Sequence, residues 1–172
     1  MLTTGLDLQI RAGRKLRLGS AHAAAQSLAV AEIASQYNGP VVLITDNTAT
    51  AYRMEQELRF FAQDLDVHLL PDWETLPYDL FSPHQDIISE RLRCLAELPT
   101  MRRGVLVVPV TTLLHRLPPL DYIRGHSLRL AKGQVLDLQA MRRSLEKSGY
   151  RHVDTVYEHG EYTLRGALLD LF

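Results

Sequence analysis

The sequence contains one cysteine, one tryptophan and no long apolar run, and these scarcities exclude several classes of protein. Cys94 has no second cysteine to pair with, so an internal disulfide and a cysteine-rich zinc site are both excluded. No stretch approaches the roughly 18 apolar residues that a membrane helix requires. The first twenty residues hold four bases but no apolar segment with a small-residue cleavage site, so no secretory signal is visible. We therefore expect a cytoplasmic protein without a membrane partner.

Positive and negative charges nearly cancel over the whole chain, but they are unevenly distributed along it. The 172 residues, 46% of them hydrophobic, fit one large domain or two small ones, and their formal net charge is -1. Residues 1–17 carry +3, residues 18–100 carry -8, residues 101–151 carry +7 and residues 152–172 carry -3. This asymmetry favours distinct modules or distinct partners. Residues 101–151, here called the basic block, fit either phosphate binding or an ordinary solvated surface. The block lacks the interleaved aromatic residues that stack on single-stranded bases.

Aliphatic runs alternate with helical patterns over the first two thirds of the chain. The runs at 41–44, 67–70 and 104–108 predict three strands, and we expect the first to be buried on both faces, as in a parallel sheet. Helical spacing predicts a helix over 21–37 capped by Ser20, a second after Asp46-Asn47-Thr48, and a third from Ser82-Pro83 to Pro99. Alternation of this kind is typical of a doubly wound α/β layer.

A proline-rich break divides the chain. Leu117-Pro118-Pro119-Leu120 interrupts the alternation, and we place a boundary there, with domains at 1–118 and 119–172. The second domain is a smaller α/β module of about 55 residues. Its expected elements are a half-exposed strand at 127–130, a helix from Asp137 to Gly149, and strands at 152–156 and 166–171.

The segment before the first helix is where an α/β protein would hold a phosphate, because helix N-termini offer free N–H groups. A phosphate loop requires G-x-x-x-x-G-K-[ST], in which glycines wrap the phosphates and the lysine supplies charge. Here Gly19 is followed by Ala24 in place of the second glycine, Ala25 in place of the lysine, and Gln26 in place of the magnesium-binding Ser or Thr. We therefore predict no ATPase site. No G-x-G-x-x-G follows a strand, so a dinucleotide site is not supported either.

Other chemical signatures are weak. The seven histidines lack metal-binding spacing, and no G-x-S-x-G marks a nucleophilic serine. Cys94 follows Arg93, which would lower its pKa, but an inert packed thiol is the expected state. Trp73, Tyr78 and Phe81 fit either a ligand pocket or a loop packed on the sheet, and we favour the packed loop.

Several longer stretches resemble a known family. They are DWETLPYD and FSPHQDIIS within 72–89, GVLVVPV at 104–110, GYRHVD at 149–154, HGEY at 159–162 and RGALLDLF at 165–172. Together they closely resemble the amino-terminal, UvrB-like region of the bacterial transcription-repair coupling factors (Mfd). The likeness extends over essentially the whole chain.

The resemblance implies a fold and a parent activity. It implies a degenerate helicase-like parallel sheet with helices on both faces, then an inserted second domain that is cut short here, with the return to the first domain outside the chain. It accounts for the defective phosphate loop, because this family keeps the fold and has lost the glycine and lysine. The longer protein would be a translocase on double-stranded DNA that uses ATP and magnesium and removes stalled RNA polymerase.

The resemblance also implies a docking role without catalysis for this chain. In this family the second domain binds UvrA and is masked in the resting full-length protein. The position that carries over is Arg165, the only base in residues 152–172; arginine is enriched at interface hot spots. An internal ion pair with Glu161 or Asp170 is the alternative for this residue. The alternatives for the chain are a residual nucleotide-binding domain and a DNA-binding module built on residues 101–151.

Overall fold

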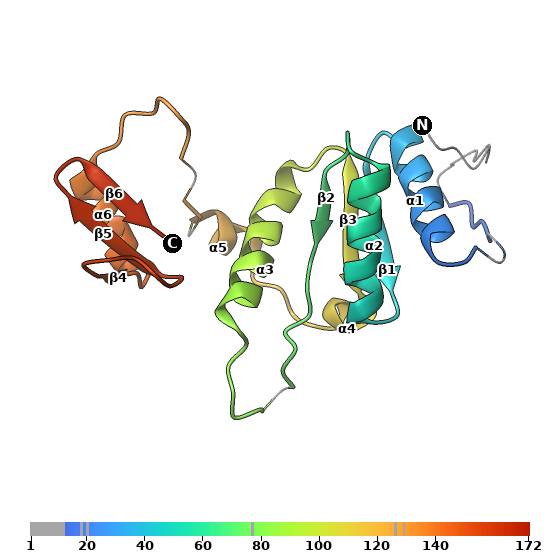
Figure 1. The fold of residues 1–172 in the computed structure, drawn as a ribbon, viewed down its shortest axis with the longest axis horizontal. Helices are drawn as coiled ribbons and strands as arrows, with labels where there is room; N and C mark the ends of the chain where they lie inside the picture. The colour runs from blue at the N-terminus through green and yellow to red at the C-terminus, as the bar shows by residue number, and fades with distance from the viewer. Residues whose placement is uncertain (1–12, 18, 20, 77, 126, 129) are drawn as a thin grey trace. The chain divides into compact units, whose positions relative to one another are not determined.

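A computed structural model describes residues 13–17, 19, 21–76, 78–125, 127–128 and 130–172. The chain divides into two compact units, Met1–Leu117 and Pro118–Phe172. Each unit contains its own three-stranded sheet (Figure 1).

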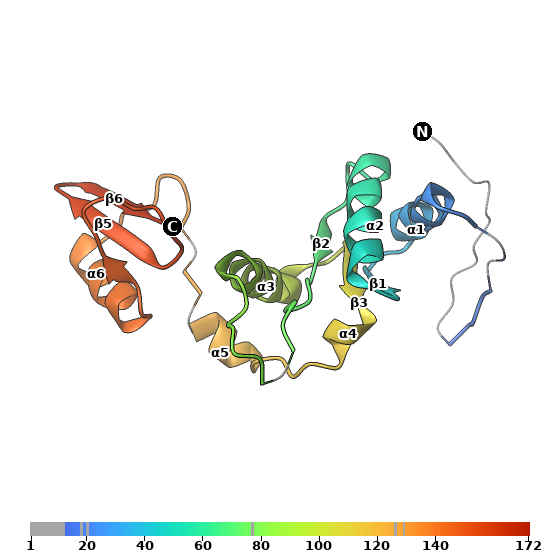
Figure 2. The ribbon, with the colours of Figure 1, turned by 60° about the horizontal axis from the view of Figure 1, so that its bottom comes forward.

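The sheet of the first unit is entirely parallel. Its order is β1 (Pro40–Thr45), β3 (Gly104–Pro109) and β2 (Val67–Leu69), so β3 is central. The three aliphatic runs therefore form strands as predicted. Figure 2 shows helices α1, α2 and α3 lying beside these strands. The α/β class with a parallel sheet is confirmed.

The two faces of this sheet are covered unequally. Helices α1 (Ala24–Gln36) and α2 (Thr48–Phe61) pack on the face that carries Val105 and Val107, and α3 (Gln85–Glu97) packs on the face that carries Val108. On this second face the hydrophobic cluster under α3 draws its sheet residues from β3 and from the end of β2, and none from β1. Val42 and Ile44 of β1 are consequently exposed. The expectation that this strand is buried on both faces is wrong.

Side-chain caps begin two of the helices, and α3 begins at Gln85, slightly later than the expected start at Ser82-Pro83. Asn47 accepts a hydrogen bond at Oδ1 from the backbone N–H of Thr50 at 2.8 Å, and His84 caps α3. The first helix begins at Ala24, later than expected, and its N-cap Ala23 makes no side-chain hydrogen bond. The expected cap, Ser20, lies outside the described residues. A 3-10 turn, η1 (Leu98–Thr100), follows α3, and α4 (Val110–Leu113) follows β3. Within the described parts of the chain, no helix combines the length and apolar character needed to cross a bilayer.

The second unit is a small mixed sheet with two helices. It contains α5 (Leu120–Gly125), α6 (Leu138–Lys147), β4 (Arg151–His152), β5 (Glu161–Arg165) and β6 (Leu168–Leu171). Strand β5 is central, parallel to β4 and antiparallel to β6. Asp137 caps α6 as predicted, because its Oδ1 accepts hydrogen bonds from the N–H groups of Gln139 and Ala140.

Three sequence-based expectations for this unit need correction. Ser127, Leu128 and Leu130 belong to no strand, and Arg129 lies outside the described residues. The strand expected at 152–156 is β4, which ends at His152. Strand β5 was not expected at all. It begins with the charged residue Glu161, which is buried. Its carboxylate accepts hydrogen bonds from the backbone N–H groups of Tyr157 and Glu158, in the segment just before the strand. A charged first residue is not part of the alternating pattern that predicts a strand.

Candidate docking site

In the described part of the segment expected to match a phosphate loop, no Lys or Arg stands in the first turn of the first helix. Ala24, Ala25 and Gln26 form the first turn of α1, after Gly19 in the preceding segment. A cavity of roughly 570 Å³ lies between α1, β1 and α2, and Gln26 is among its lining residues. Its one lining cation is Arg53, whose Nη1 already contacts Glu57 Oε1 at 2.8 Å. The geometry thus supplies no free positive side chain for a phosphate among the described residues of this cavity.

Cys94 is a packed thiol inside the hydrophobic cluster under α3. It is almost completely buried beside Leu70 and Val108. Burial raises the pKa of its thiol to about 11, and Glu97 acts in the same direction, outweighing Arg93 and Arg91. The thiolate, which is the reactive form, is therefore strongly disfavoured in the folded chain.

We expect Cys94 to resist alkylation while the chain is folded. At about pH 9 a thiol of pKa 11 is roughly 1% ionised, so iodoacetamide should react about 50-fold more slowly than with the unfolded chain. Mass spectrometry of the alkylated protein, with and without urea, measures this ratio. Equal rates in the two samples would contradict the buried assignment.

Of the three aromatic residues singled out between β2 and α3, only Trp73 packs against the unit. The guanidinium carbon of Arg91 lies 4.1 Å from the centroid of the Trp73 ring. Tyr78 and Phe81 are exposed instead, with their side chains directed into solvent. The prediction of a loop packed on the sheet is therefore correct for Trp73 and wrong for the other two, and the three rings form no common pocket.

Arg165 ends the central strand of the second unit. It pairs with Leu168 across a hairpin whose two-residue loop is Gly166-Ala167. Gly166 adopts φ +60° at the first loop position, a conformation that favours glycine and is required by the type II′ class of hairpin turn. The guanidinium is exposed, and its Nη2 donates a hydrogen bond to the backbone carbonyl of Asp154 at 3.0 Å. The turn thus presents a partly immobilised, solvent-facing arginine.

The expected alternative partner of Arg165 is occupied elsewhere. Glu161 Oε1 accepts a hydrogen bond from Arg151 Nη2 at 2.9 Å, and Oε2 accepts two more from the backbone N–H groups of Tyr157 and Glu158, each at 3.0 Å. No ion pair joins Arg165 to Glu161 or Asp170 within the described part of the chain. Asp154 was not anticipated as a partner, because its backbone carbonyl and not its side chain holds Arg165.

Glu161 also links the stability of the second unit to pH. The backbone N–H groups of Tyr157 and Glu158, followed by Arg151, lower the pKa of this carboxyl below its usual value. A lowered folded-state pKa gives stability that is complete above the unfolded value of about 4.3 and is lost as pH falls through the folded value.

We therefore expect the Tyr157 and Glu158 amides to lose hydrogen-exchange protection as pH falls below about 4.3. The variant E161Q should lower their protection at neutral pH and flatten this dependence, because its neutral amide accepts more weakly than a carboxylate. NMR-detected exchange, corrected for intrinsic rates, measures both effects. The control E158Q changes an exposed carboxyl 3.7 Å from Arg151 and should retain the wild-type profile. A flat profile in the wild-type chain would contradict the assignment.

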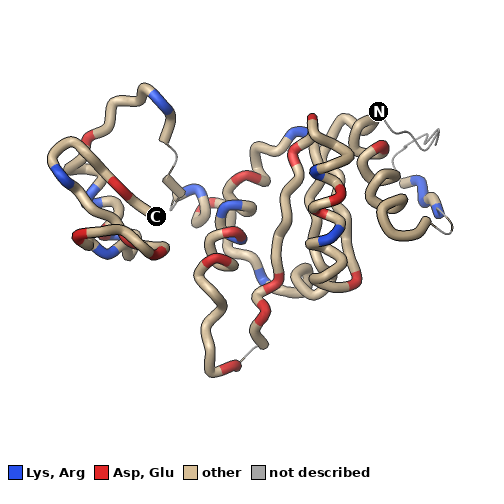
Figure 3. The backbone as a smooth tube through the Cα atoms, in the orientation of Figure 1, with Lys and Arg blue, Asp and Glu red and all other residues tan. Residues whose placement is uncertain are grey.

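Several arginines of the basic block serve internal contacts. Arg103 donates to the carbonyls of Ala34 and Ser35 near the end of α1, and Arg142 Nε lies 2.9 Å from Glu146 Oε1. Figure 3 shows acidic and basic residues interspersed along α2 and α3, whereas the segment between β2 and α3 carries acidic residues without Lys or Arg. Among the described residues, no group of three or more His, Cys, Asp or Glu side chains is arranged to hold a metal ion.

Residues 128–172 match the family described as the UvrB interaction domain, and this range contains α6 and the entire sheet of the second unit. The chain is 54% identical over 165 residues to a transcription-repair-coupling factor of Escherichia coli, covering 96% of this chain and 14% of the relative. It is 46% identical over 155 residues to the factor of Haemophilus influenzae, covering 90% and 13%. The Staphylococcus aureus factor is 28% identical over 143 residues, covering 83% and 12%.

All three relatives are transcription-repair-coupling factors, and the similarity to them runs through both units. The chain spans only about one seventh of their length. The resemblance drawn from the motifs is therefore confirmed, and the chain belongs to the transcription-repair-coupling factor family, as a UvrB-like region that contains a UvrB interaction domain.

Proposed function

We propose that this chain is a non-catalytic docking module that binds UvrA through its second unit and so recruits excision repair to sites of stalled RNA polymerase. The observation that carries the proposal is the coincidence of the UvrB interaction domain, residues 128–172, with the sheet that presents Arg165. An arginine whose guanidinium is held at one nitrogen and exposed elsewhere is suited to a carboxylate on a protein partner.

The electrostatics of Arg165 support a protein partner. It is the only base in residues 152–172, which carry four acids, and Arg151 already offsets one of these, Glu161. A partner that binds the hairpin would desolvate Arg165, whose charged neighbours in residues 152–172 are all acidic. Arginines that become buried in an interface commonly contribute a large share of the binding energy.

The direct test is a calorimetric titration of purified UvrA with this chain. Saturable one-to-one binding is expected. The same preparation should show no heat with ATP and magnesium, because the phosphate loop has alanine at positions 24 and 25. Binding of ATP would favour the residual nucleotide-binding alternative. Binding of duplex DNA with steep salt dependence would favour a DNA-binding module on residues 101–151.

For the longer protein we propose the activities that the family resemblance implies. These are ATP-driven translocation on double-stranded DNA and contact with RNA polymerase, with the motor outside this chain and the UvrA surface masked by the rest of the polypeptide. A role in transcription-coupled repair also favours a cytoplasmic location.

A further inference from the structure

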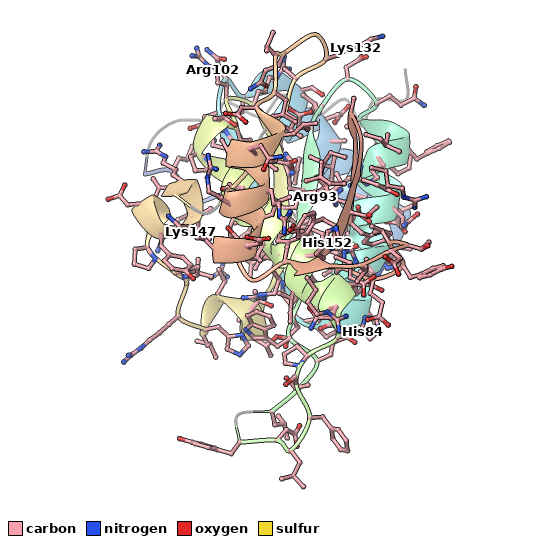
Figure 4. All side chains as sticks on the ribbon, turned by 90° about the vertical axis from the view of Figure 1, so that its left-hand side faces the viewer. His84, Arg93, Arg102, Lys132, Lys147 and His152 are labelled. Atoms are coloured by element: carbon pink, nitrogen blue, oxygen red, sulfur yellow. The ribbon has the colours of Figure 1, made fainter. Side chains whose placement is uncertain are left out.

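The segment between β2 and α3 carries a cluster of exposed apolar side chains. Leu76, Tyr78, Leu80 and Phe81, here called the apolar finger, have relative exposures between 75% and 103%. Figures 1 and 2 show this segment extending away from the sheet, and Figure 4 shows the side chains that precede His84 projecting into solvent. Soluble monomers rarely gather large apolar side chains in this way unless the surface contacts something else.

The root of the apolar finger is firmly held. Arg91, only 1% exposed, donates from Nη1 to the carbonyl of Pro71 and stacks over Trp73. Asp72 Oδ2 accepts hydrogen bonds from the hydroxyls of Thr111 and Thr112, which follow β3. Burial opposes ionisation of Asp72, but these bonds and the N–H of Glu74 outweigh it and lower its pKa. The carboxylate is thus charged at neutral pH, and it ties the finger to the sheet. An anchored root reduces the entropy lost when the tip is bound.

The charge around the apolar finger selects among possible partners. Residues 71–89 contain Asp72, Glu74, Asp79 and Asp86 and no Lys or Arg. A nucleic acid or an anionic membrane would be repelled by this segment, because both require basic residues near the aromatic side chains. The complementary surface is an apolar cleft in a protein, bordered by Lys or Arg.

We infer that the apolar finger docks into an apolar cleft with a basic rim in the remainder of the coupling-factor polypeptide. The chain covers only 14% of its Escherichia coli relative, so in the longer protein proposed above, on which this inference rests, most of the polypeptide would lie outside these 172 residues. A cleft on the same polypeptide would meet the finger at a high effective concentration, which favours it over a separate protein of equal affinity. Arg165 lies in the other unit, so this inference and the proposed UvrA docking can fail independently.

The test grafts this chain into the Escherichia coli factor in place of the matching region. Hydroxyl-radical labelling of Tyr78, Leu80 and Phe81 is then compared between the isolated chain and the graft. Docking should bury these side chains as in the centre of an interface and slow their labelling by about tenfold. Equal labelling in both proteins would overturn the inference. Protection that appears only after UvrA or duplex DNA is added would overturn it as well.

A double variant, Y78S/F81S, provides a second and independent readout. Because both side chains are exposed in the isolated chain, its thermal midpoint should change little there. In the graft the same variant should lower the midpoint of the first unit and increase the protease sensitivity of residues 71–84. The matched control is F60S, which removes an exposed aromatic ring from α2. If Y78S/F81S changed neither the thermal midpoint nor the protease sensitivity of the graft, the inference would be overturned even if labelling slows.

Discussion

Replacing Arg165 by alanine is expected to weaken binding of UvrA by about 30-fold or more, which corresponds to about 2 kcal/mol. The guanidinium is exposed at the end of β5 and is oriented by the carbonyl of Asp154. Because it is partly immobilised before binding, it loses little rotamer entropy in the complex. Calorimetric titration of purified UvrA with the wild-type chain and the R165A variant measures the change.

Two control variants separate the role of Arg165 from general charge. R143A removes an exposed arginine on α6 in the same unit and should alter affinity less than about threefold, because scattered surface charges contribute little. R165K keeps the charge but loses the planar fork, so it should remain well below the wild-type affinity. If R165A binds UvrA as tightly as the wild-type chain while its circular dichroism is unchanged, Arg165 is not the contact residue.

Replacing Gly104 by alanine is expected to destabilise the first unit by at least about 3 kcal/mol. Gly104 begins the central strand β3 with φ +132°, a conformation that side chains other than glycine rarely adopt. A Cβ there would lie 2.2 Å from the carbonyl oxygen of Asp66 and 2.8 Å from Met101 Cε. The Asp66 carbonyl cannot move aside, because it accepts the hydrogen bond from Val105 N–H that starts the pairing of β2 with β3.

Urea unfolding followed by fluorescence of Trp73, the only tryptophan, measures this loss in the first unit. The matched control is G13A, because Gly13 also has positive φ, +74°, but open space around the added Cβ. G13A should lower the free energy of unfolding by about 1 kcal/mol or less, since the added Cβ strains the backbone there without a clash. A loss in G104A no larger than that in G13A would show that the contact with Asp66 is not decisive.

Local patterns in the sequence determined the elements that depend on near neighbours. The aliphatic runs became the three strands of the parallel sheet, and Asn47 and Asp137 capped α2 and α6 as their side chains indicated. The mismatch of Ala24 and Ala25 with the glycine and lysine that a phosphate loop requires was equally readable, because that motif is contiguous. Such features need no knowledge of the rest of the fold.

Tertiary structure decided which faces and charges are free. The exposed side of β1 results from a hydrophobic cluster under α3 that does not extend to this strand, and the exposure of Tyr78 and Phe81 results from Arg91 holding only the root of their loop. Strand β5 escaped prediction because a buried carboxylate, Glu161, opens it. Arg165 forms no ion pair with Glu161, which is paired with Arg151, and it donates instead to the carbonyl of Asp154. The contacts of Arg151, Arg165 and Arg91 join residues ten or more positions apart, beyond the reach of local sequence patterns, and only folding brings these groups together.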